Sequence, residues 1–367
     1  MKQQQNFSTK LGIIPQGWHI KRLGEICTHF QSGTSITSKQ LKKNGQYPVY
    51  GGNGLRGYTD KYTHDGPYIL IGRQGALCGN INFVENKNFI SEHAIAVQSN
   101  ENMIWLKYKL EYWNLNRFSE SSAQPGLSVK KLARQKLTIP PLPEQQKIAE
   151  IISTWDKAIE KQSQLIEKLE MRKKGLTQQL LTAKRRLPGF STPWKKVKLG
   201  EICNITTGKL DANAMEDNGI YPFFTCAKDV YKINKYAFDT EALLISGNGE
   251  YVGYVHYCKG KFNAYQRTYV LDRFRDNIFY LKYTLQYYLP KRILQTKSNS
   301  NTPYIVIGTL KYMIILEPSM AEQTAIAEVL KTADHEIELA KQKLELFRQQ
   351  KHGLMQQLLT GKKRVKL

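Results

Sequence analysis

The chain has 367 residues, 41% of them hydrophobic, which is long enough for two domains with sizeable buried cores. Its 54 lysines and arginines exceed its 31 acidic residues, and the formal net charge of +23 favours a polyanionic partner, above all nucleic acid. The absence of an apolar signal core, and of any apolar run near ~18 residues, predicts a soluble, cytoplasmic protein without a membrane. Five cysteines without a CxxC pair predict free thiols rather than a zinc site or disulfides.

The first predicted element is a mostly-β domain at residues 1–142. Short β-branched runs such as PYILIG, separated by Gly, Asn and Pro, are typical of short strands. Gly52, Gly54 and Gly57 have the spacing of a dinucleotide-binding loop, but the Gly-Pro pair at 66–67 leaves no room for the helix that must follow such a loop. We therefore interpret them as turn glycines and expect Arg56 to lie in a loop.

A long helix is predicted at residues 143–186, and the segment LPGFSTP (187–193) links it to the second half of the chain. A second β-rich domain is predicted at 187–318 and a second long helix at 319–367. The cations that follow the helices, in LLTAKRR and LLTGKKR, fit two interpretations. They interact with the negative end of the helix macrodipole, or they contact phosphate.

The second half of the chain repeats the first. The segment LGEIC after Trp18 returns after Trp194, Tyr47-Pro48 returns as Tyr221-Pro222, and QQLLT occurs in both long helices. One unit of about half the chain has been duplicated, so a catalytic group should make chemical sense in both copies.

Both helices carry an apolar seam whose steps alternate between four and three residues. A helix lying on its own domain could produce this pattern, but the flanking Lys, Glu and Gln leave only a narrow stripe to pack. We therefore predict that the two helices pack on each other as an antiparallel coiled coil. The seam consists of Ile148, Ile152, Trp155, Ile159, Ile166, Leu169, Leu176 and Leu180 in the first helix, and Ile326, Leu330, Ile337, Leu344, Phe347, Leu354 and Leu358 in the second.

Three catalytic interpretations fail, two of them on the comparison between the copies. Asp65, Glu85 and Lys87 resemble a metal-dependent nuclease motif, yet Lys259 occupies the position of Glu85 in the second copy. The segment NTPY (301–304) lacks the second proline and the glycine motif of an amino-methyltransferase. His93 aligns with Arg267, which is no acid–base equivalent. We therefore predict no catalytic residue and no metal site.

Two β-rich domains, each followed by a long heptad helix, form a recognisable pattern when combined with IPPLPEQQKIA (139–149), GLTQQLLTAKRR and GLMQQLLTGKKR. The chain resembles the DNA specificity (S) subunit of type I restriction-modification enzymes over essentially its full length. In the second copy LEPSMAEQTAIAEVL replaces the double-proline entry into the helix.

The resemblance implies an α+β fold with two pseudo-symmetric target-recognition domains, each recognising half of a split double-stranded DNA site. It implies a non-catalytic subunit that binds methyltransferase (M) subunits and a restriction (R) subunit, with S-adenosylmethionine, ATP and magnesium in those partners. The alternative is a nuclease or methyltransferase that acts alone. A basic scaffold without sequence preference is a further alternative.

Basic and amide side chains in the β-rich domains are the candidates for DNA contact, since Arg pairs with guanine and Asn or Gln with adenine. Each lysine also fits a solvated loop. The candidates are Lys39, Lys42, Lys43, Arg56, Arg73, Gln74 and Gln124 in the first domain, and Lys209, Lys228, Lys232, Asn248, Gln266, Arg267 and Lys297 in the second.

Overall fold

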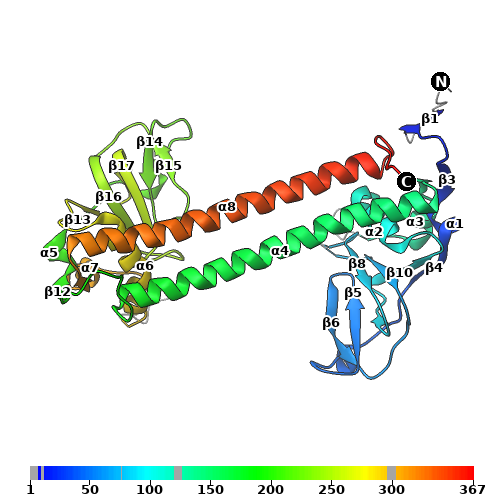
Figure 1. Ribbon diagram of the computed structural model, residues 1–367, viewed down its shortest axis with the longest axis horizontal. Coiled ribbons are helices and arrows are strands. Elements are labelled where there is room, and N and C mark those ends of the chain that lie inside the picture. Colours follow the sequence, from blue (N-terminus) through cyan, green and yellow to red (C-terminus); the bar gives the residue numbers. More distant parts are fainter. Residues whose placement is uncertain (1–6, 10–11, 76, 120–125, 296–302) are drawn as a thin grey trace. The chain divides into compact units, whose positions relative to one another are not determined.

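The computed structural model describes residues 7–9, 12–75, 77–119, 126–295 and 303–367. The chain forms two compact units (Figure 1). Unit 1 comprises Met1–Ser163 and Lys343–Leu367, and unit 2 comprises Gln164–Gln342. Each unit contains one β-rich domain and part of both long helices, α4 (Leu142–Leu181) and α8 (Met320–Leu358). No helix in the described ranges is long and apolar enough to cross a membrane, and all five cysteines are free.

The β-rich part of unit 1 consists of short sheets. A four-stranded antiparallel sheet has the order β4-β10-β7-β8, and a three-stranded sheet has the order β6-β5-β9, in which β5 and β9 are parallel. Two-stranded ladders join β11 to β3 and β1 to β2. The strands are β1 (Phe7–Thr9), β2 (Gly12–Ile14), β3 (His19–Arg22), β4 (Cys27–Ser32), β5 (Tyr47–Gly51), β6 (Gly54–Thr59), β7 (Tyr68–Gly72), β8 (Ile81–Val84), β9 (Phe89–Ile90), β10 (Ala94–Ser99) and β11 (Lys136–Ile139).

Unit 2 builds the corresponding strands into one six-stranded sheet of order β13-β18-β16-β17-β14-β15 and one ladder, β12-β19. Its strand β17 runs unbroken through the region where unit 1 divides the chain into β8 and β9. The strands are β12 (Lys195–Lys198), β13 (Asn204–Thr207), β14 (Tyr221–Phe224), β15 (Tyr231–Ile233), β16 (Phe238–Ser246), β17 (Val255–Ala264), β18 (Thr268–Asp272) and β19 (Ile314–Glu317).

Each β-rich part also contains helices, most of them short. Unit 1 has α1 (Leu23–Ile26), α2 (Met103–Trp113), α3 (Val129–Ala133) and the 3₁₀ turns η1 (Ser38–Gln40) and η2 (Leu115–Phe118). Unit 2 has α5 (Leu199–Ile202), α6 (Ile278–Gln295), α7 (Ile307–Lys311) and the 3₁₀ turn η3 (Ala212–Ala214). The prediction of an α+β fold with two mostly-β domains and long helices is confirmed.

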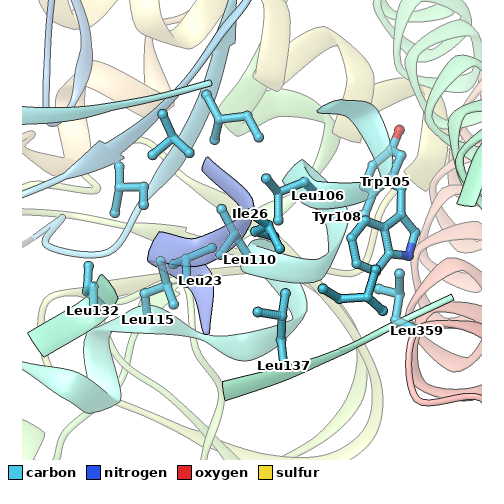
Figure 2. Packing of buried hydrophobic residues seen from close by; sticks show 14 of the residues in the cluster. Leu23, Ile26, Trp105, Leu106, Tyr108, Leu110, Leu115, Leu132, Leu137 and Leu359 are labelled. Atoms are coloured by element: carbon cyan, nitrogen blue, oxygen red, sulfur yellow. The ribbon is translucent and has the colours of Figure 1, made fainter. Parts of the chain in front are cut away.

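The hydrophobic core of unit 1 contains side chains from the strands, from the short helices, and from α8 and the segment that follows it. Leu23, Trp105 and Leu110 are fully buried, and Leu359 from the segment after α8 belongs to the same cluster (Figure 2). At about 25 cal/mol per Å² of buried apolar surface, such a cluster is a main source of stability. The C-terminal segment is therefore part of the first domain's core.

The two helices run antiparallel within each unit. In unit 1 the ring of Trp155 meets that of Phe347 edge-on at 5.6 Å, and Lys351 pairs with Asp156. In unit 2 Lys173 pairs with Asp334, and Arg172 pairs with Glu336. Every predicted seam residue is buried or half-buried.

A buried glutamate anchors the start of each long helix. In unit 1 the Glu144 carboxylate accepts hydrogen bonds from Trp18 Nε1 (3.0 Å) and from Arg364 Nε and Nη2 (2.6 and 2.7 Å). In unit 2 Glu322 accepts the same three bonds, from Trp194 Nε1 (2.9 Å) and from Arg186 Nε and Nη2 (2.8 and 2.7 Å). We call these two clusters the Trp–Glu–Arg anchors.

The glutamine after each anchor glutamate also holds the junction between the β-rich domain and the long helix. Gln145 Oε1 accepts from Asn102 N at 2.9 Å while Gln145 Nε2 donates to Pro140 O at 2.9 Å. Gln323 repeats this, accepting from Asn277 N (2.9 Å) and donating to Pro318 O (3.1 Å). Losing the double proline in the second copy therefore leaves the junction unchanged.

The anchors correct two expectations. Arg186 and Arg364, the last cations of LLTAKRR and LLTGKKR, bind buried carboxylates, a role that neither interpretation of these cations included. The first long helix ends at Leu181 and not at residue 186, because Ala183 adopts a left-handed φ of 57° and turns the chain toward the anchor. Gly361 (φ 73°) ends α8 in the same way.

Candidate nucleic-acid interface

Three loops of unit 1 meet at the end of strand β7. Arg73 N donates to His93 O (2.9 Å), and Leu127 N donates to Arg73 O (2.9 Å). A β-bridge joins Gln74 to Gly126. We call this group, residues 72–75, 91–94 and 126–127, loop cluster 1. Backbone hydrogen bonds hold it, so its side chains can vary without loss of the frame.

Unit 2 builds the same frame from different residues. Gly247 N donates to Arg267 O (2.9 Å), Ile305 N donates to Gly247 O (2.9 Å), and a β-bridge joins Asn248 to Tyr304. We call residues 246–249, 265–268 and 303–305 loop cluster 2. Its backbone bonds match those of loop cluster 1 one for one.

Close backbone packing explains the glycine beside each cluster. A Cβ on Gly33 would lie 2.2 Å from Ile90 O, and a Cβ on Gly208 would lie 1.9 Å from Ala264 O. Both distances are far below any real contact, so a larger residue would force the loops apart. These glycines support the frame; their positions do not require a phosphate ligand.

Different residues occupy corresponding positions of the two clusters. Gln74 corresponds to Asn248, His93 to Arg267 and Gly126 to Tyr304. In cluster 1 His93 Nδ1 lies 3.1 Å from Gln74 Oε1, and His93 Nε2 lies 3.4 Å from Glu92 Oε1. These side chains carry the donors and acceptors that match base edges in the major groove.

In cluster 2 Gln266 Nε2 donates to Asp211 Oδ1 at 2.7 Å. Gln266 N is bonded to Leu210 O, which places the neighbouring Lys209 beside the cluster. Arg267 is exposed. Lys228 lies over the ring of Tyr251 at 4.8 Å, just beyond Gly249. Basic and acidic side chains therefore alternate around the second cluster, with Asp211 on Gln266 and Glu250 and Asp229 near Tyr251.

The structure thus brings together some of the predicted DNA-contacting residues. Arg73 and Gln74 share cluster 1, and Lys209, Lys228, Asn248, Gln266 and Arg267 gather at cluster 2. Lys232 lies apart in β15, and Lys39 in η1 and Lys43 are exposed elsewhere on unit 1. Gln124 and Lys297 lie outside the described residues.

One of the predictions needs correction. Arg56 lies in strand β6 and not in a loop, because the β5–β6 turn is confined to Gly52 and Asn53; its Nη1 faces Ser91 Oγ at 3.4 Å. Lys42 forms an exposed ion pair with Asp60, and its contact with DNA stays a prediction.

His93 and Tyr304 belong to the loop clusters but are not among the residues predicted from the sequence. The sequence suggests His93 only as an acid or base, which its second-copy counterpart does not support. The alignment of His93 with Arg267, a predicted DNA contact, is the signal that identifies it. Tyr304 aligns with Gly126, and the alignment of a tyrosine with a glycine gives no comparable signal.

The residues of the nuclease-like motif do converge in unit 1. Asp65, Glu85 and Lys87 line a cavity of about 620 Å³ together with Tyr47 and Tyr50. However, the described residues contain no group of three or more His, Cys, Asp or Glu side chains placed to hold a metal ion. In unit 2, Lys259 carries a positive charge where Glu85 carries a negative one, and the continuous strand β17 replaces the break between β8 and β9.

The two β-rich domains thus share one backbone frame and differ in the side chains of their loops. The chain matches the family model described as "Type I restriction modification DNA specificity domain" at residues 15–171 and again at 191–347. The protein belongs to this family.

Individual relatives agree with this assignment. The EcoDI specificity subunit of Escherichia coli, a type I restriction enzyme subunit, is 43% identical over 167 residues, which cover 46% of this chain and 37% of the relative. The chain therefore spans little more than a third of that subunit's length. The MjaVIII specificity subunit of Methanocaldococcus jannaschii is 26% identical over 429 residues, covering 99% of this chain and 97% of the relative.

The fold also matches a solved structure. The crystal structure of a type I restriction-modification S subunit from M. genitalium superposes with a TM-score of 0.66 over 95% of this chain and 96% of that chain. Its sequence identity is 16%, so this likeness establishes the fold.

Proposed function

We propose that this protein is the DNA specificity subunit of a type I restriction-modification complex, in which each β-rich domain recognises one half of a split site. One observation carries the proposal: two loop clusters share one backbone frame and differ in side chains at corresponding positions. A base-reading surface needs this property, because the frame fixes the approach and the side chains select the sequence.

The side chains fit that task. Arg267 has the fork that pairs with the O6 and N7 atoms of guanine, and Asn248 or Gln74 can pair with adenine. The net charge of +23 supplies the sequence-independent attraction to phosphates. Different residues in the two clusters imply two different half-sites.

We infer that the subunit catalyses no reaction and that methyltransferase (M) and restriction (R) subunits bind to it. S-adenosylmethionine, ATP and magnesium belong to those subunits in this proposal. Family membership supports it, together with the loss of the nuclease-like motif and of His93 in the second copy.

The test is co-expression with a cognate methyltransferase followed by mapping of methylated sites. Asn248→Ala is expected to relax or change one half-site, and Gln74→Ala the other, with a loss of about 1–3 kcal/mol of discrimination for each lost bidentate contact. Lys161→Ala, at an exposed position of α4 outside the clusters, serves as the control. A change in both half-sites from either substitution would contradict the assignment of one domain to each half.

A second measurement tests the absence of catalysis. The purified chain alone is expected to produce neither cleaved nor methylated DNA when supplied with duplex DNA, magnesium and S-adenosylmethionine. Turnover that co-purifies with the chain would support the rival proposal of an enzyme that acts alone.

A further inference from the structure

Each unit holds a lysine over an exposed tyrosine that rests on a second tyrosine. In unit 1 Lys87 Nζ lies 4.7 Å from the centroid of the Tyr62 ring, which meets Tyr47 at 5.1 Å and 60°. In unit 2 Lys261 Nζ lies 4.6 Å from the Tyr236 ring, which meets Tyr221 at 5.1 Å and 65°. We call these two groups the Lys–Tyr–Tyr stacks.

The stacks are retained where the neighbouring sequence differs. The segment around Tyr62 reads KYTH and its counterpart reads KYAF; the segment around Lys87 reads VENKN and its counterpart CKGKF. The loop clusters diverge between the copies, whereas the stacks keep both composition and geometry. A shared feature of two domains with different half-sites fits a task that does not depend on base sequence.

The stacks present oriented hydrogen-bond donors to solvent. Tyr62 and Tyr236 are 44% and 46% exposed. In the described part of the chain, neither Lys87 nor Lys261 forms an ion pair with a carboxylate, in contrast to Lys42. The ring beneath each ammonium restricts a side chain that would otherwise lose conformational entropy on binding.

We propose that each Lys–Tyr–Tyr stack is a binding site for a phosphate of the DNA backbone, with the lysine ammonium and the tyrosine hydroxyl as donors. Lysine and tyrosine are common phosphate contacts, and such contacts fix the orientation of a protein on the duplex without reading sequence. The inference rests on the proposed DNA-binding function and adds the positioning site that the loop clusters lack.

The spacing within unit 1 is compatible with this role. Tyr47 begins β5 and Gly51 ends it next to loop cluster 1, a separation of about 13 Å along the strand. The major groove is ~12 Å wide, so a loop that contacts base edges is flanked by phosphates at a similar distance.

Charge next to the stacks predicts unequal strength. Asp65 and Glu85 lie in the cavity with Lys87. In unit 2 Asp239 is the cross-strand neighbour of Lys261 and Glu241 that of Lys259, and Lys259 takes the place of Glu85. Both sites therefore have two carboxylates nearby that repel phosphate, and the additional cation at the second site attracts it. The stack of unit 2 is therefore the stronger site.

The experiment measures the affinity of the full chain for short random-sequence duplexes as a function of salt. Lys87→Ala and Lys261→Ala are each expected to weaken binding several-fold and to reduce the slope of log K against log salt by about 0.9, the effect of one lost phosphate contact. Lys261→Ala should give the larger loss of affinity. Lys161→Ala and Lys168→Ala remove the same charge from exposed positions of α4 and are the matched controls.

A second set of variants tests the tyrosine. Tyr62→Leu removes the ring. The slope of log K against log salt for this variant should fall as far as the slope for Lys87→Ala. The double variant, Tyr62→Leu with Lys87→Ala, should show no further fall. Tyr62→Phe keeps the ring and should keep most of the slope. A stack that only stabilises the fold would lower the melting temperature and leave every slope unchanged, which would overturn the inference.

Two further outcomes are decisive. An equal fall in slope for the α4 controls would show a general charge effect, and a changed methylated sequence in Lys87→Ala or Lys261→Ala would show base reading; either result overturns the phosphate site. Failure of the unsubstituted chain to bind any duplex, alone or with its methyltransferase, would overturn the proposed function itself. Unchanged slopes in a chain that does bind DNA would overturn this inference alone.

Discussion

Lys109 lies inside the core of unit 1, where its ammonium donates to Leu359 O at 2.6 Å and to Thr138 Oγ1 at 3.3 Å. Burial lowers the pKa of Lys109 to about 8, since the charged form loses its hydration. The corresponding residue of unit 2 is Thr284, which carries no charge. The lysine therefore adds a titratable contact between α2 and the C-terminal segment in one copy only.

The shifted pKa predicts how stability changes with pH. Between the folded pKa of about 8 and the ordinary value of 10.5, the unfolded chain retains a proton that the folded chain has lost, so the contribution of Lys109 to stability rises with pH. Relative to Lys109→Met, the free energy of unfolding of the unsubstituted chain should rise by up to about 3 kcal/mol over this range. Urea unfolding at a series of pH values measures it. Thr284→Val should show no such pH-dependent difference, and parallel curves for Lys109→Met would contradict the prediction.

At the scale of the element, the Trp–Glu–Arg anchors fix where each long helix begins. Glu144 is 1% exposed and receives three charge-assisted or indole hydrogen bonds. Glu144→Gln should lower the free energy of unfolding by about 2 kcal/mol, because a neutral amide accepts more weakly from the guanidinium. Thermal unfolding checks this, and Glu150→Gln, which affects only an exposed ion pair on the same helix, should cost less than about 1 kcal/mol. Equal losses for the two variants would show that the anchor is no stronger than a surface pair.

Some of the elements could be predicted from the sequence, and others could not. Heptad spacing identified both helices and placed their first residues to within one position, because a long narrow apolar stripe has few other solutions. Their ends were predicted too late, at residues 186 and 367 instead of Leu181 and Leu358. The same spacing contains no information on Glu144 and Arg364, which meet across 220 positions of sequence. Arg56 was misplaced because Gly54 and Gly57 resemble turn glycines, whereas their positive φ values occur within strand β6. Only part of each loop cluster could be predicted from the sequence. Backbone hydrogen bonds, such as the one from Arg73 N to His93 O, do not depend on residue type and therefore leave no signal in the sequence.

At the scale of the whole molecule, we propose that the length of the two long helices sets the gap between the half-sites of the proposed DNA target. In unit 2, the Lys173–Asp334 pair places residues 169–176 of α4 opposite residues 330–337 of α8. Seven residues inserted between Leu169 and Leu176, with seven more between Leu330 and Ile337, would lengthen both helices by about 10 Å while keeping the heptad seam in register.

We expect the methylated sequence of this double insertion to keep both half-sites and to gain about three base pairs in the gap, because base pairs rise ~3.4 Å along the duplex. Sequencing of methylated genomic DNA measures both quantities at once. The single insertion in α4 is the control, since it breaks the register of the seam and should abolish methylation rather than shift the gap. Altered half-site bases, or an unchanged gap in a methylating complex with the double insertion, would show that helix length does not determine the spacing of the DNA site.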